Sequence, residues 1–80
     1  MNEGGAMTVT IAYFAEPSVP GVQPANLSIA EGDFATHEEA LIKACHTADG
    51  LQAHSFVIDF PDGTSERHVR DGDGWKEDDA

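Results

Sequence analysis

The segment from Thr36 to Gly50 constrains the fold most, because it predicts the best-defined helix of the chain. Thr36 and Glu39 form a capping box, in which each side chain satisfies a backbone N–H of the first turn. Gly50 supplies a left-handed residue that ends the helix, with Leu51 folding back on the last turn, so the predicted helix covers residues 36–49. Its single narrow apolar stripe consists of Ala40, Leu41, Ala44, Cys45 and Ala48.

Two alternating segments precede this helix. Met7–Phe14 alternates hydrophobic side chains with threonines and predicts a half-buried strand. In residues 26–30, two large aliphatic side chains alternate with polar and small ones, which predicts a short second strand that pairs back on the first. Residues 16–25 contain three prolines and are predicted to form a loop. Residues 31–33 are predicted to form a turn before the helix.

A β-hairpin is predicted around Pro61-Asp62-Gly63, which separates two further strand-like segments. A two-residue Asp-Gly turn would pair Phe56 with Val69, whereas a three-residue turn would pair Phe56 with His68. We favour the three-residue turn, because Pro61 has no N–H to complete the closing pair of the other. In either register one strand face, the expected core side, carries His54, Phe56, Ile58 and Phe60.

The end of the chain is predicted to be a turn at 71–74, then Trp75 folded half-exposed onto the sheet, then an acidic tail. The order β-β-α-β-β indicates a small single α+β domain, an antiparallel sheet with one helix packed on one face. We expect this domain at 7–76, between a disordered N-terminal tail at 1–6 and an acidic C-terminal tail at 77–80. The other sheet face is expected to be polar, because it carries Thr8, Thr10, Ser55 and Asp59.

Charge restricts the partners that this chain can bind. Its 80 residues include 15 acidic and 4 basic side chains, for a formal charge of −11. Phosphate backbones and anionic membranes both attract clustered Lys and Arg, so we expect neither a nucleic-acid nor a membrane partner. A partner steered by charge would be basic. A single cysteine and the lack of a basic, then apolar, N-terminal signal lead us to expect a bacterial cytoplasmic protein.

Candidate chemical groups are few and scattered. Metal sites use paired short spacings, which are absent from the set His37, Cys45, His46, His54 and His68. Adjacent helical residues diverge by about 100°, so the Cys45–His46 pair does not form a nucleophile with its base. We assign no catalytic residue, metal ligand or cofactor. His54 and His68 fall on adjacent predicted strands and could face each other; together with Trp75 they are the candidate partner contacts.

These observations favour a non-catalytic domain that acts through protein–protein contacts or as a small homo-oligomer. Pairing of sheet edges, or covering of the open sheet face, would each produce a homodimer. One alternative is an acidic inhibitor or antitoxin-like protein that captures a basic partner, with binding weakened by salt. The other is a weak metal or small-ligand site around His54, His68 and Trp75.

Overall fold

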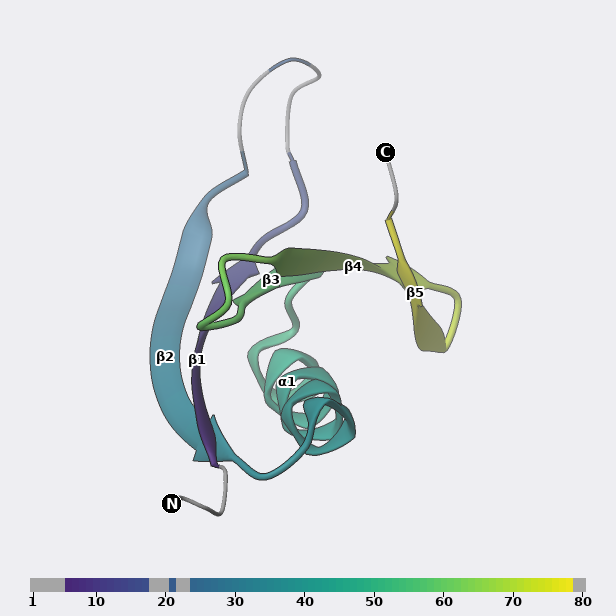
Figure 1. Ribbon diagram of the computed structural model, residues 1–80. Helices are drawn as coiled ribbons and strands as arrows, with labels where there is room; N and C mark the ends of the chain where they lie inside the picture. The colour runs from purple at the N-terminus through teal and green to yellow at the C-terminus, as the bar shows by residue number, and fades with distance from the viewer. Residues whose placement is uncertain (1–5, 18–20, 22–23, 79–80) are drawn as a thin grey trace.

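Five strands and one helix make up the described chain (Figure 1). The computed structural model describes residues 6–17, 21 and 24–78. Its elements are β1 (Met7–Phe14), β2 (Asn26–Phe34), α1 (His37–Leu51), β3 (Ser55–Asp59), β4 (Ser65–Asp71) and β5 (Gly74–Glu77). The strands form one antiparallel sheet in the order β2-β1-β3-β4-β5. The predicted α+β class is confirmed, with one strand more than predicted. Residues 1–5, Pro20 and residues 79–80 lie outside the described part.

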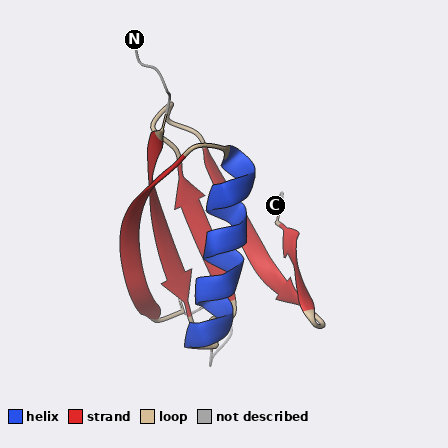
Figure 2. Cartoon of the chain, turned by 90° about the horizontal axis from the view of Figure 1, so that it is seen from below, coloured by secondary structure: helices blue, strands red, loops and turns tan. Residues whose placement is uncertain are grey.

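The core lies between α1 and one face of the sheet (Figure 2). On the helix it consists of alanines, and the half-buried Leu41 and Cys45 pack beside it. Alanines let the helix approach the sheet closely, so larger side chains from the strands fill the space. The predicted stripe is confirmed, and so is the predicted core side of the hairpin for Phe56, Ile58 and Phe60, whereas His54 is not part of the core. The fully buried helix residues are Ala40, Ala44 and Ala48, and the buried strand residues facing them are Val9, Ile11, Tyr13, Phe56 and Ile58.

The β3–β4 hairpin has the three-residue turn. Phe56 pairs with His68, and the Phe60 N–H donates to the Thr64 carbonyl at 2.8 Å. Gly63 has φ +93°, a left-handed conformation that glycine adopts without steric cost. The favoured register is therefore confirmed, and it sets which β4 side chains face α1.

Both ends of α1 are capped, but only the first as predicted. The Glu39 N–H donates to Thr36 Oγ1 at 3.1 Å, and Glu39 Oε1 accepts from the Ala35 N–H at 3.2 Å. The predicted end at Gly50 is wrong, because α1 continues to Leu51 and Gln52 takes the left-handed conformation at φ 58°. The Ala53 N–H then donates to the Ala48 carbonyl at 2.9 Å. This later end buries Ala53, rather than the exposed Leu51, against the last turn.

Residues 31–33 belong to β2. The prediction of a turn at these residues is therefore wrong. These residues pair with residues 8–10 of β1, and Thr8 Oγ1 donates to Asp33 Oδ1 at 2.6 Å. A strand partner of eight residues thus overrides the turn composition of Glu-Gly-Asp.

The fifth strand, β5, was missed because its four residues carry almost no strand pattern. Asp71 pairs with Gly74 around a two-residue turn in which Gly72 has φ +63°. A positive φ at the first turn position suits a tight hairpin, so the chain folds back along β4. Glu77 is therefore part of the sheet, and the Asp78 N–H donates to the Arg67 carbonyl at 2.8 Å, which corrects the predicted tail at 77–80.

The sheet face away from α1 is not simply polar, contrary to the prediction. No helix of the described chain covers this open face (Figure 2). Register places the predicted Thr8, Thr10, Ser55 and Asp59 on it, although Ser55 is buried. The same alternation adds a group of hydrophobic side chains, Ala12, Phe14, Ile29, Val57 and Val69.

Candidate functional site

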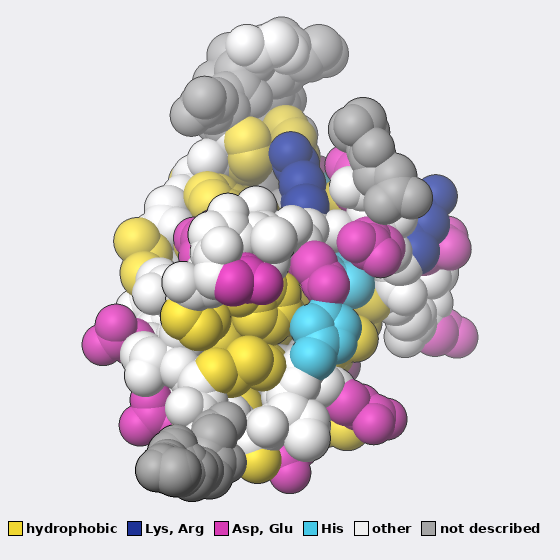
Figure 3. Space-filling view, viewed as in Figure 1, with side chains coloured by type: hydrophobic (Ala, Val, Ile, Leu, Met, Phe, Trp, Pro, Cys, Tyr) yellow, Lys and Arg dark blue, Asp and Glu magenta, His cyan; other side chains and the backbone are white. Residues whose placement is uncertain are grey.

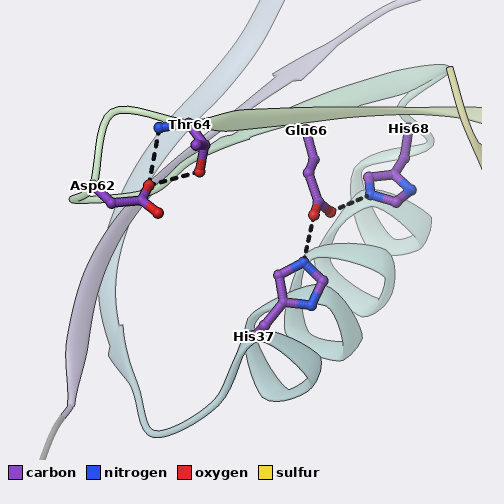
Figure 4. A network of polar contacts seen from close by, with 5 residues as sticks. All are labelled: His37, Asp62, Thr64, Glu66 and His68. Atoms are coloured by element: carbon purple, nitrogen blue, oxygen red, sulfur yellow. Dashed lines mark hydrogen bonds and ion pairs between the residues drawn. The ribbon is translucent and has the colours of Figure 1, made fainter. Parts of the chain in front are cut away.

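A carboxylate joins two imidazoles on the helix side of the sheet (Figure 4). His37 Nε2 lies 2.6 Å from Glu66 Oε2, and His68 Nε2 lies 3.1 Å from Glu66 Oε1. The helix cap places His37 in the first turn of α1, whereas strand alternation points Glu66 and His68 from β4 toward the helix. The arrangement therefore ties the start of α1 to β4.

Electrostatics favour the ionised form of Glu66. Burial raises the pKa of this carboxyl, but hydrogen bonds with His68 and His37 and the electrostatic attraction of their imidazoles lower it further than burial raises it. The pKa of Glu66 is therefore below its ordinary value of 4.5. The group is suited to holding two imidazoles in place.

His68 and Trp75 are used in internal packing. His68 is 7% exposed and stacks on Phe56 with 5.1 Å between ring centroids. Trp75 packs on the same ring at 5.0 Å and is half-buried as predicted, while the Arg70 guanidinium lies 4.4 Å from its centroid. Arg70 also donates to Asp49 Oδ1 at 3.0 Å, which ties the end of α1 to β4.

His54 does not join this group. The Arg70 N–H donates to the His54 carbonyl at 2.9 Å, so His54 lies beside Arg70 rather than opposite His68. Within the described residues, no side-chain hydrogen bond or ring contact links His54 to His68 or Trp75. The expectation that the two histidines face each other is therefore wrong.

A pocket of about 310 Å³ opens beside the carboxylate–imidazole group. His37 stacks on Phe60 at its wall, with 5.1 Å between centroids. Figure 3 shows cyan histidine side chains between acidic and hydrophobic ones on this side of the molecule. The other lining residues include Asp62, whose Oδ1 already accepts from both the N–H and the hydroxyl of Thr64. Over the described ranges, no three His, Cys, Asp or Glu side chains are arranged to hold a metal ion.

Cys45 is not an activated thiol. Burial, and then the negative charge of Asp49, raise the pKa of Cys45 above its ordinary value. A raised pKa disfavours the thiolate, which is the nucleophilic form. Cys45 instead packs beside the helix alanines.

A second candidate site is the outer edge of β2, defined as the side of Asn26–Phe34 that faces away from β1. None of the other described strands pairs with it, although β2 is nine residues long. Ile29 is 64% exposed and Leu27 is 42% exposed, and hydrophobic side chains reach the surface over β2 at the left of Figure 3. Long edge strands usually carry charged side chains, Pro, a β-bulge or a covering segment that prevents pairing. The sequence Asn26–Phe34 contains neither lysine nor proline; its charges, Glu31 and Asp33, lie in its second half, and its pairing with β1 has one register shift, between Tyr13 and Phe14.

The open sheet face next to β2 is hollowed. A groove of about 250 Å³ is lined by Phe14, Pro24, Val57 and Arg67. Ile29 lies on the same face, since it pairs with Ala12, which in turn pairs with Val57. The outer edge of β2 therefore continues into a partly apolar surface that the helix does not cover.

Comparisons with known proteins identify no relative. No protein-family model matches the sequence, and neither a curated protein nor a solved structure is significantly similar to it. In the described chain, α1 has neither the length nor the apolarity to cross a membrane.

Sequence reasoning missed Glu66 and Ile29, the central residues of the two sites. Glu66 follows from the three-residue turn, because that register puts it on the helix side together with His68. Its contact with His37 needs the crossing position of α1, which local patterns do not provide. Ile29 was visible as one of two aliphatic residues in a short strand, but the residues that β2 turns toward the helix are Ser28, Ala30 and Gly32. Only the pairing with β1 reveals that arrangement.

Proposed function

We propose that this protein is a non-catalytic interaction domain whose binding surface is the outer edge of β2. The observation that carries the proposal is the exposed pairing edge of a nine-residue strand, with Leu27 and Ile29 on it. Such an edge offers a row of backbone donors and acceptors to an added strand. Covering these hydrophobic side chains with a partner removes apolar surface from water, which favours binding.

Features of the other site support the same proposal. The Glu66 carboxylate already hydrogen-bonds to two imidazoles, and Trp75 is packed between Phe56 and Arg70. These groups hold α1 on the sheet.

Capture of a basic partner receives less support. Several acidic side chains already have partners, since Asp49 contacts Arg70, Asp78 contacts Arg67, and Glu66 contacts two histidines. Salt separates the two functions, because it weakens attraction between opposite charges and leaves strand pairing intact.

Site-specific photo-crosslinking tests the proposal. A photo-crosslinking residue replaces Ile29 in the native organism, and the matched control carries it in place of Ile42, which is 61% exposed on α1. We expect a covalent protein adduct from position 29 and none from position 42. Absence of an adduct from position 29, or equal adducts from both positions, would contradict the proposal.

A further inference from the structure

We propose that the outer edge of β2 binds a second copy of this chain, strand to strand and antiparallel, with the two Ile29 side chains facing each other at a two-fold axis. This inference rests on the proposed function and names its partner. It follows from the distribution of apolar and charged side chains along β2 and from the small side chains on the helix side of the strand.

The pattern along β2 keeps acidic side chains apart when the strand pairs with its own reverse. The exposed hydrophobic residues Leu27 and Ile29 lie in the first half of the strand, and the acidic Glu31 and Asp33 lie in the second half. An antiparallel pair centred on Ile29 sets Glu31 of each copy opposite Leu27 of the other. The two Ile29 side chains then meet in the middle, and no acidic side chain lies opposite another.

Parallel pairing of the same two edges would separate the apolar residues. It requires one copy to be turned over about the strand axis, so the two Ile29 side chains would lie on opposite faces of the joined sheet. In an antiparallel pair, directly opposite residues share one face, so the two Ile29 side chains meet, and the two-fold axis closes the dimer. The position of Ile29 therefore favours the antiparallel arrangement.

The helix side of β2 leaves room for a neighbouring strand. Toward α1 the strand carries Ser28, Ala30 and Gly32 before Phe34, so this side of the strand has no bulky side chain along most of its length. Antiparallel pairing keeps both helices on one side of a continuous sheet, and the open faces of the two copies join at the Ile29 pair. That junction brings together the apolar surfaces that include Phe14 and Val57.

Net charge fixes the sign of the salt dependence. Each copy carries −11, so two copies repel at low ionic strength. Salt screens this repulsion, and we expect dimerisation to tighten at least about threefold between 50 and 500 mM NaCl. Capture of a basic partner would have the opposite dependence.

Complementary charged variants test the two-fold geometry by sedimentation equilibrium. We expect the wild-type mass to rise from monomer toward dimer with concentration. Ile29→Lys and Ile29→Glu should each weaken self-association at least about tenfold, because like charges face each other at the axis. An equimolar mixture of the two should recover to within about threefold of wild type, since Lys then faces Glu. Ile42→Lys is the control for an equal change elsewhere and should have no effect.

Several results would overturn the inference. They are a wild-type monomer at every concentration up to about 1 mM, an equal effect of Ile42→Lys, or a mixture that does not associate although both variants keep the wild-type circular dichroism spectrum. Ile29→Thr serves as the test if a charged variant does not fold, because it keeps a β-branched residue in the strand. It should weaken association about threefold. A monomer that still crosslinks from position 29 to a protein of another mass would overturn this inference and leave the proposed function standing.

Discussion

Glu66 shows how a single side chain connects elements that are far apart in the sequence. Its carboxylate contacts His37 on α1 and His68 on β4. The lowered pKa of Glu66 means that the folded state binds its proton less readily than the unfolded chain. This contribution to stability is therefore present above pH 4.5 and is lost as pH falls through the folded-state pKa.

Glu66→Gln should reduce this part of the acid sensitivity. The free energy of unfolding of the variant, measured in urea at pH 7, 5 and 3, should fall less toward pH 3 than that of wild type. At pH 7 the variant should be less stable by about 1–3 kcal/mol, because two charge-assisted hydrogen bonds are weakened. Glu16→Gln, at an exposed loop position, is the control and should follow wild type. Parallel pH profiles for Glu66→Gln and wild type would show that the carboxylate does not have this role.

At the scale of elements, Gly50 was predicted to be the left-handed residue that ends α1, whereas in the structure it lies within the helix. Gly50 is helical, and an added methyl group would meet nothing within 4 Å. Gly50→Ala should therefore raise the free energy of unfolding by about 0.5–1 kcal/mol, since alanine loses less backbone entropy in a helix. Gln52→Gly, at the left-handed position, should also stabilise the protein. A loss of stability in Gly50→Ala, measured by urea denaturation, would instead indicate that Gly50 is the left-handed residue.

Local signals predicted the elements whose boundaries depend on local chemistry. Thr36 and Glu39 determine the start of α1 through their own hydrogen bonds, and Pro61-Asp62-Gly63 determines the hairpin register. The elements that were predicted wrongly depend on partners distant in sequence. The second half of β2 is a strand because β1 lies beside it, and β5 is a strand because β4 does.

On the scale of the whole molecule, the candidate sites also depend on contacts between segments that are distant in sequence. Sheet edges and an open face were predicted as routes to a homodimer, but which edge is exposed depends on the strand order. Trp75 and His68 were expected to contact a partner, yet the unpredicted β5 brings Trp75 onto Phe56 beside the buried His68. Ile29 became visible as a binding residue only once its strand was known to be an edge.

Association through β2 is tested most directly by amide hydrogen exchange at two protein concentrations. Outer-edge amides of Asn26–Phe34 should exchange at least about threefold more slowly at about 1 mM than at about 10 µM, because strand pairing protects them. Amides of Gly74–Glu77, at the opposite edge of the sheet, should exchange at the same rate at both concentrations. Exchange in β2 that is independent of concentration, or equal protection of β5, would contradict this account.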